Sequence, residues 1–168
     1  MPLGLEKKLN LTIGDGIIFT GKYDKVEWDD EPNGLVRILD YKTGKPDKHL
    51  KSIDDCDELA SDACDEYLRQ LVAYKLLFEH DARESGGRKV KRGVLVFVEP
   101  VSADIRKLGY KKGDYAAKPI ELSDDMVEEL VDVIKDVWNN IKRLQFEKLK
   151  ERDKDKCAHC DFDSICWK

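Results

Sequence analysis

The sequence predicts one domain of the α/β or α+β class, in which a small mixed β-sheet packs against helices. Three patterns predict it. Apolar and polar residues alternate from residue 5 to 27, a wholly apolar run occupies residues 94–98, and two long stretches repeat apolar residues every three or four positions. The chain has 168 residues, about the length of one domain. No internal repeat or low-complexity linker divides the sequence, so we expect a single core.

The first three strands follow from the N-terminal pattern. Residues 5–13 and 17–27 alternate in the manner of strands around a short glycine-containing turn, which predicts an antiparallel hairpin. The next turn reads DDEPNG, and residues 35–42 (LVRILDYK) after it predict a third strand that pairs back antiparallel. The polar, acidic segment of residues 43–58 is predicted to be a loop.

The rest of the chain predicts two helices and two further strands. Apolar residues at three- and four-residue steps predict a helix over residues 59–79, and the same spacing after the N-cap Ser123 predicts another over residues 124–150. The run VLVFV at residues 94–98 is typical of a strand buried on both faces. A last strand is expected at residues 118–122. The buried stripe of the second helix is expected to be Val127, Leu130, Ile134, Val137, Ile141 and Leu144.

Composition favours a charged globular domain of the cytoplasm. The 30 Lys and Arg residues against 35 Asp and Glu residues give a formal net charge of -5. No segment approaches the ~20 apolar residues of a membrane span, and the N-terminus has no apolar leader. Five cysteines are an odd number, which argues against a disulfide framework in that compartment. Cys64 falls on the apolar stripe of the first predicted helix, where a buried free thiol is expected.

A D-x-K triplet at the end of the third predicted strand carries the chemistry. Asp40 and Lys42 are two residues apart and therefore point to one face, to which Tyr41 offers its backbone carbonyl. Asp24 on the preceding strand can reach the same place. Such oxygen ligands suit Mg²⁺ or Mn²⁺, and a nearby lysine can orient the attacking water or neutralise charge on a phosphate. The pattern favours phosphodiester hydrolysis, and the alternative is an ordinary ion pair on an exposed strand.

These residues, with two more on the following helix, resemble the PD-(D/E)XK nuclease superfamily and, within it, the RecB-like branch. The resemblance rests on residues 21–24 (GKYD), residues 38–44 (ILDYKTG) and residues 70–74 (QLVAY), in this order. It covers most of the chain. It implies a restriction-endonuclease-like fold, with a mixed central sheet flanked by helices.

The resemblance also implies a role for each matching residue. Asp24 and Asp40 would bind the cation, together with the Tyr41 carbonyl, and Lys42 would be catalytic. Gln70 and Tyr74 would support the site or contact DNA. The alternative for these two is a polar residue and a core aromatic residue on an amphipathic helix.

The end of the chain holds three cysteines at the spacing C-x2-C-x5-C. Cys157, Cys160 and Cys166 at this spacing can bind iron or zinc. The resemblance extends to them, because RecB-like nucleases of the AddB type and the related CRISPR-adaptation nucleases hold a [4Fe-4S] cluster there, with a fourth cysteine from a segment before the nuclease strands. That fourth ligand is missing here, and His159 would be an awkward substitute in a zinc site.

We therefore expect the chain to be the C-terminal part of a longer nuclease or helicase-nuclease. Residues 1–150 would form the nuclease core, and residues 151–168 the Cys-rich, cluster-binding segment of the same domain. The [4Fe-4S] cluster would be complete in the intact protein and incomplete or absent in this piece. The resemblance implies an exonuclease that acts on single-stranded DNA or duplex ends in repair or recombination, with a helicase region or subunit as partner.

Two groups of basic residues are expected near the sheet, where a DNA backbone would lie and single-stranded bases would stack on tyrosines. The alternative for both groups is a solvated loop. Two alternatives also stand for the whole chain: an inactive DNA-binding module that guides DNA through a partner helicase, and a zinc-stabilised interaction domain. The basic groups are Arg88, Lys89, Lys91 and Arg92, then Arg106, Lys107, Lys111 and Lys112, with Tyr110 and Tyr115 interleaved.

Overall fold

The computed structural model describes residues 1–14, 16–53, 56, 58–61, 64–145 and 150–167. The chain forms two compact units, Met1–Ile134 and Lys135–Lys168. The first unit contains the whole sheet and every residue of the predicted nuclease motif. The second unit contains the three C-terminal cysteines.

A five-stranded mixed sheet forms the first unit, in the order β1-β2-β3-β4-β5. The pairs β1/β2, β2/β3 and β4/β5 are antiparallel, and β3/β4 is parallel. The three N-terminal strands and their antiparallel pairing are confirmed. The two later strands are longer than the sequence predicted. The strands are β1 (Gly4–Ile13), β2 (Ile17–Asp30), β3 (Leu35–Lys42), β4 (Lys89–Pro100) and β5 (Tyr115–Glu121).

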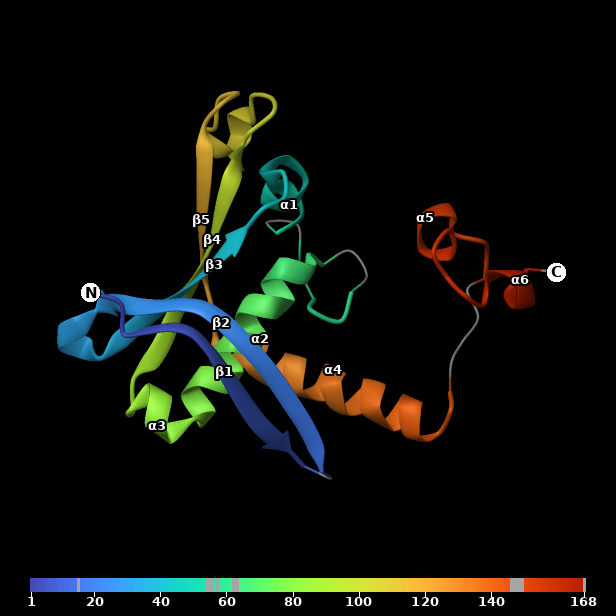
Figure 1. The fold of residues 1–168 in the computed structure, drawn as a ribbon, viewed down its shortest axis with the longest axis horizontal. Helices are drawn as coiled ribbons and strands as arrows, with labels where there is room; N and C mark the ends of the chain where they lie inside the picture. Colours follow the sequence, from blue (N-terminus) through green and yellow to red (C-terminus); the bar gives the residue numbers. More distant parts are fainter. Residues whose placement is uncertain (15, 54–55, 57, 62–63, 146–149, 168) are drawn as a thin grey trace. The chain divides into compact units, whose positions relative to one another are not determined.

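Helix α2 (Glu66–His80) packs against β1, β2, β3 and β4, as Figure 1 shows in green. Two strand glycines allow its close approach. A Cβ atom at Gly21 would lie 2.6 Å from Leu77 Cδ1, and one at Gly93 would lie 2.8 Å from Leu71 Cδ1. Because α2 rests on the strands here, its buried leucines and Phe78 form the centre of the core.

Two predictions for the segment before α2 are wrong. The predicted loop over residues 43–58 contains helix α1 (Pro46–Ser52), which begins with a proline whose φ is already helical and which buries Leu50. The helix predicted from residue 59 begins only at Glu66. Leu59 and Cys64 are buried although they are not helical, so their apolar spacing comes from a packed loop rather than from a helix. Of the predicted stretch 43–79, residues 54–55, 57 and 62–63 lie outside the described residues.

The prediction of a free thiol at Cys64 is also wrong, because Cys56 and Cys64 form a disulfide. Their Cα atoms are 4.6 Å apart, within the range that a disulfide requires. The odd number of cysteines argued against disulfides, but five cysteines are also compatible with one disulfide and three free thiols, which here are Cys157, Cys160 and Cys166. The number of cysteines alone therefore cannot show whether two of them form a bond.

Helix α4 (Asp124–Lys142) begins as predicted, with the Met126 N–H donating to the Ser123 hydroxyl at 3.2 Å. It ends earlier than residue 150. The Gln145 N–H donates to the Asn140 carbonyl at 2.8 Å and Leu144 has a φ of 54°, which is a Schellman ending. The predicted stripe packs on the core only as far as Ile134, and Val137, Ile141 and Leu144 are exposed. Residues 146–149 of the predicted helix lie outside the described residues.

The remaining elements are short. They are the 3-10 helices η1 (Glu31–Asn33) and η2 (Arg106–Leu108), helix α3 (Ala82–Ser85), and in the second unit α5 (Lys154–Cys157) and α6 (Asp163–Cys166). Within the second unit, the Arg152 guanidinium forms two bonds with the Asp163 carboxylate, at 2.9 and 2.5 Å. No helix in the described part of the chain has the length and apolar character of a membrane span.

Candidate active site

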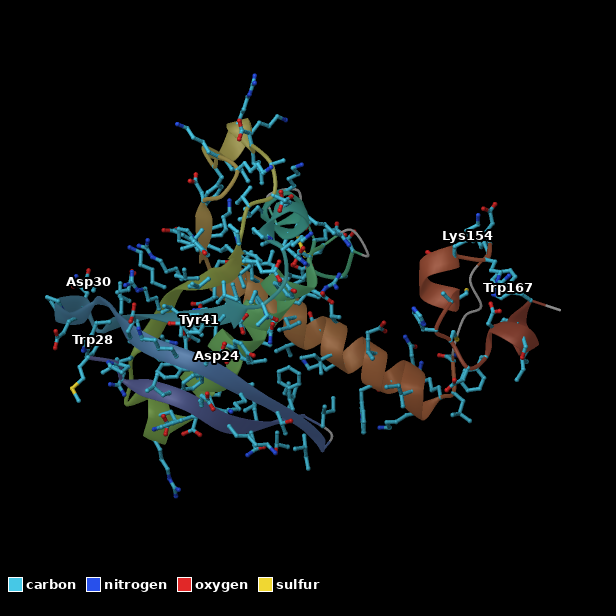
Figure 2. All side chains as sticks on the ribbon, turned by 45° about the horizontal axis from the view of Figure 1, so that its top comes forward. Asp24, Trp28, Asp30, Tyr41, Lys154 and Trp167 are labelled. Carbon is cyan, nitrogen blue, oxygen red and sulfur yellow. A yellow bond between two sulfur atoms is a disulfide. The ribbon has the colours of Figure 1, made fainter. Side chains whose placement is uncertain are left out.

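The candidate site lies where β2 and β3 separate. The β2/β3 ladder ends at the pair Lys25 and Leu39, so the next residues, Asp24 and Asp40, are free to turn their side chains to the site. Asp24 Oδ2 accepts the backbone N–H of Tyr41 at 2.8 Å, which replaces the missing ladder bond and holds Asp24 beside β3. Figure 2 labels Asp24 on β2 and Tyr41 on the neighbouring β3.

Asp40 is the buried carboxylate of the site, with 3% of its surface exposed. Burial raises the pKa of Asp40, and the nearby Asp24 charge raises it further, while Lys42 acts in the opposite direction. Lys42 Nζ forms an ion pair with Asp40 Oδ2 at 2.5 Å. Asp40 Oδ2 is therefore buried in contact with the Lys42 ammonium.

Gln70 and Tyr74 are one turn apart on α2 and both face the site. The Lys42 ammonium donates to Gln70 Oε1, and Gln70 Nε2 donates to the Tyr74 hydroxyl at 2.6 Å. That hydroxyl also interacts with Asp40; burial first, and then the Asp40 charge, raise the pKa of Tyr74 to about 12. Tyr74 is therefore a core aromatic residue whose hydroxyl lies at the candidate site.

An aromatic layer beside Lys42 was not predicted from the sequence. The Lys42 ammonium lies 4.1 Å from the centroid of the Tyr67 ring, and the His49 ring stacks on Tyr67 with centroids 4.0 Å apart. Phe97 of β4 lies behind both rings. These residues come from α1, α2 and β4, and none belongs to the motif. The only sequence signal was the position of His49 shortly after the triplet and of Tyr67 one turn before Gln70.

Asp65 joins α1 to α2 behind this layer. It is buried and accepts the Tyr67 N–H at 2.9 Å, a bond from His49 Nδ1 at 2.9 Å, and the Ser52 hydroxyl. Burial alone would raise the pKa of Asp65, but these hydrogen bonds outweigh burial and lower it. An ionised Asp65 thus caps α2 and fixes the His49 ring against Tyr67.

The donor set fits a hard divalent cation. Asp24 and Asp40 supply carboxylate oxygens from adjacent strands, and a cation that binds the buried Asp40 Oδ2 would take the place that the Lys42 ammonium holds in this structure. In the described part of the chain no three His, Cys, Asp or Glu side chains converge as a complete metal site. The two carboxylates therefore form an open, two-residue site, which suits a cation that keeps several waters or substrate oxygens.

The three C-terminal cysteines are not gathered in the same way. Cys157 is buried, Cys160 is exposed and Cys166 is half-buried, and all three are free thiols. They are not among any converging group of three metal-ligating side chains in the described residues. Thiolates suit iron or zinc, and the three cysteines belong to one short stretch of the second unit.

The structure separates the two predicted basic groups. Residues 88–92 lie at the start of β4, whereas residues 106–112 lie in the connection between β4 and β5. Tyr115 is exposed at the start of β5, while the Tyr110 hydroxyl donates to the Ala117 carbonyl at 3.2 Å. The two tyrosines therefore differ, since only Tyr115 presents an open ring.

The site thus combines paired carboxylates with a lysine at the end of the central strand of a mixed sheet. The chain belongs to the PD-(D/E)XK nuclease superfamily, whose family profile matches residues 1–167. Members of this superfamily typically use Mg²⁺ or Mn²⁺. The match confirms the restriction-endonuclease-like fold expected from the sequence.

The chain also has a similar solved structure, titled "Crystal structure of SSO0001". The two are 18% identical and superpose with a TM-score of 0.44 over 98% of this chain and 60% of that one. The chain thus spans about 60% of the length of that protein. No curated protein matches the chain.

Proposed function

We propose that this protein is a metal-dependent DNA nuclease that hydrolyses phosphodiester bonds at the site formed by Asp24, Asp40 and Lys42. One observation carries the proposal: the five motif residues, far apart in the sequence, form one connected cluster. Asp24 is bonded to β3, Lys42 to Asp40 and Gln70, and Gln70 to Tyr74. The superfamily match supports the same chemistry.

Each residue has a role that its contacts support. Asp24, Asp40 and the Tyr41 carbonyl would hold Mg²⁺ or Mn²⁺. When bound, the cation would act as a Lewis acid toward the phosphate. Lys42 would place its ammonium beside the phosphate and stabilise the negative charge that builds there. Gln70 and Tyr74 would keep Lys42 and Asp40 in position, because they bond to both.

Finer assignments belong to the same proposal. We assign the protein to the RecB/AddB-like branch, as an exonuclease on single strands or duplex ends that acts in repair or recombination in the cytoplasm. Residues 1–150 would be the nuclease core, and residues 151–168 the Cys-rich segment. In a longer parent protein with a helicase region or subunit, Cys157, Cys160 and Cys166 would hold a [4Fe-4S] cluster with a fourth ligand from elsewhere.

Calorimetric titration of Mn²⁺, together with cleavage of labelled DNA, tests the proposal. The native chain should bind Mn²⁺ and cut DNA, Asp40→Asn should lose both, and Lys42→Ala should bind Mn²⁺ but lose most turnover, because the lysine acts on the phosphate rather than on the cation. Asp125→Asn, an exposed carboxylate on α4, is the matched control and should behave as the native chain. Equal Mn²⁺ binding by native and Asp40→Asn chains would exclude this metal site. DNA binding with Mn²⁺ but no cleavage would favour the inactive DNA-binding module instead.

A further inference from the structure

The two ends of β4 differ in their distance from the candidate site. In the parallel β3/β4 ladder, Asp40 is opposite Leu95 and Lys42 is opposite Phe97, toward the C-terminal half of β4. The connection from β4 to β5, residues 101–114, leaves β4 at that same end. Figure 1 shows the upper ends of β4 and β5 extending past β3, with α1 beside them. We call residues 101–114 the hairpin tip.

The basic residues at the other end of β4 mostly have partners within the fold. The Arg88 guanidinium donates to the carbonyls of Ser85 and Glu84 at 2.6 and 2.7 Å. Lys89 pairs with Glu79 at 2.8 Å, and Arg92 pairs with Asp29 at 3.1 Å. Three of the four cations in residues 88–92 therefore have structural partners, and within the described part of the chain only Lys91 is left for a ligand.

The cations of the hairpin tip are exposed and have no acidic partner in the part of the chain that the structure describes. The two carboxylates of the tip are used by its backbone: Asp104 accepts the Lys112 N–H at 2.9 Å and Asp114 accepts the Lys111 N–H at 2.7 Å. The tip therefore presents excess positive charge on a chain whose net charge is -5. These four cations are Arg106, Lys107, Lys111 and Lys112.

The tip is anchored to the elements that hold the site. Asp47 of α1 accepts the N–H of Ser102 at 3.1 Å and its hydroxyl at 2.8 Å, and it also accepts the Ala103 N–H at 3.3 Å. Val101 and Ile105 are buried in the core. The same α1 carries His49, which packs on Tyr67 beside Lys42. The tip is thus fixed at the site end of the sheet rather than being a free loop.

We propose that the hairpin tip binds the phosphates of single-stranded nucleic acid, with the exposed Tyr115 ring stacking on an unpaired base. This inference rests on the proposed nuclease function and identifies the surface that guides its substrate. Lysines and arginines without acidic partners attract a phosphate backbone, and an aromatic face binds any unstacked base. Tyr115, 71% exposed at the foot of the tip, supplies that face. The basic group at residues 88–92 is not part of this surface.

Fluorescence anisotropy of a labelled single-stranded oligonucleotide, measured in EDTA so that no cleavage occurs, tests the binding surface. Lys111→Ala/Lys112→Ala should weaken binding by about tenfold and reduce the salt slope by about 1.4, since each single-strand phosphate contact contributes about 0.7. Lys8→Ala/Lys91→Ala removes two exposed lysines elsewhere on the sheet and should change neither value. Tyr115→Ser should weaken single-strand binding and leave duplex binding unchanged. Equal loss on both DNA forms would overturn the stacking role of Tyr115.

A cleavage assay separates this inference from the proposed function. With Mn²⁺, the tip variant should raise KM for single-stranded DNA while hydrolysing bis-p-nitrophenyl phosphate at the native rate, because that small diester does not reach the tip. Native-like DNA binding and KM in the tip variant would overturn the tip inference and leave the nuclease proposal standing. If the native chain hydrolyses neither substrate, the nuclease proposal fails, and the EDTA binding data still decide whether the tip binds nucleic acid.

Discussion

At the scale of single residues, Lys42 shows how the site is held together. Its ammonium has three neighbours: Asp40 two residues away on β3, and Gln70 and the Tyr67 ring on α2. A cation bound at Asp40 would compete with Lys42 for that carboxylate. Gln70 and Tyr67 would then keep the ammonium at the site, so the aromatic layer matters most in the metal-bound state.

Replacing Tyr67 tests this role of the aromatic layer. Tyr67→Leu should lower kcat for DNA by about fivefold with little change in KM, because a cation–π contact to a partly exposed ring is worth about 1 kcal/mol and acts on Lys42 rather than on DNA binding. Tyr67→Phe keeps the ring and should restore the native kcat. Steady-state kinetics with Mn²⁺ give both values. A Tyr67→Phe variant as slow as Tyr67→Leu would show that the hydroxyl, not the ring, is what matters.

Asp40 should make the metal-free fold depend on pH. Because burial raises its pKa above the unfolded value near 3.9, the folded chain binds the extra proton between these two values. The stability that Asp40 contributes is therefore largest below the unfolded pKa and is lost as the pH rises through the folded pKa. Removing the buried charge should thus stabilise the fold at neutral and higher pH.

Thermal unfolding in EDTA checks this expectation. At pH 8, Asp40→Asn should raise Tm by about 2–4 °C, which corresponds to about 1 kcal/mol in a chain of this size, and the gain should vanish near pH 4. Mn²⁺ should then raise the Tm of the native chain but not that of Asp40→Asn. Asp125→Asn should show no gain at either pH. A lower Tm for Asp40→Asn at pH 8 would mean that the pair with Lys42 outweighs burial.

At the scale of elements, the segment between β3 and α2 decides how the site is assembled. Helix α1 brings His49 to Tyr67, and its Asp47 holds the hairpin tip. Asp65 then caps α2 and bonds back to α1. The disulfide between Cys56 and Cys64 closes the connection just before this cap. The segment therefore links three features of the site: the lysine, the supporting helix and the basic tip.

Counting reactive thiols before and after reduction tests the disulfide. The denatured, unreduced chain should show three reactive thiols, from Cys157, Cys160 and Cys166, and the reduced chain should show five. The double variant Cys56→Ser/Cys64→Ser should show three thiols under both conditions. It should also unfold at a lower temperature, because a disulfide that closes a loop of this length stabilises the folded chain by about 2.5 kcal/mol. Ellman titration and thermal melts provide the data. Five thiols before reduction would contradict the bond.

At the scale of the whole molecule, the two kinds of candidate metal ligand lie in different units. Asp24 and Asp40 belong to the unit Met1–Ile134, and the three free cysteines belong to the unit Lys135–Lys168. The family profile spans both units. Because the two sets of ligands lie in different units, we expect the carboxylate site to bind its cation independently of any metal held by the cysteines.

Calorimetry on a cysteine variant tests that independence. Cys157→Ser/Cys160→Ser should bind Mn²⁺ within about twofold of the native affinity, because every proposed Mn²⁺ ligand lies in the other unit. Anaerobic preparation with iron should give any visible absorption only in the native chain. A large loss of Mn²⁺ affinity in the variant would show that the two units act together. A stoichiometric zinc content without iron would exclude the iron-sulfur assignment.

The sequence by itself predicted the first three strands and the motif residues. Alternation with a period of two marks a half-buried strand locally, so β1, β2 and β3 were predicted with nearly correct ends. The D-x-K spacing on one strand likewise places Asp40 and Lys42 on one face without any tertiary information. Asp24 was predicted from its place on the preceding strand, whereas Gln70 and Tyr74 were predicted through the family resemblance, since they lie on a helix.

Tertiary structure alone decided what depends on contacts between distant segments. Helix α1 is short and polar, with one buried leucine, so its sequence has no helical period to detect. The roles of His49, Tyr67 and Asp65 follow from packing among α1, α2 and β4. The two basic groups have similar sequences, and only the fold shows that residues 88–92 are mostly paired whereas the hairpin tip has no acidic partner among the described residues. Local sequence patterns predict secondary structure, whereas ion pairs and ring contacts depend on which distant segments pack together in the fold.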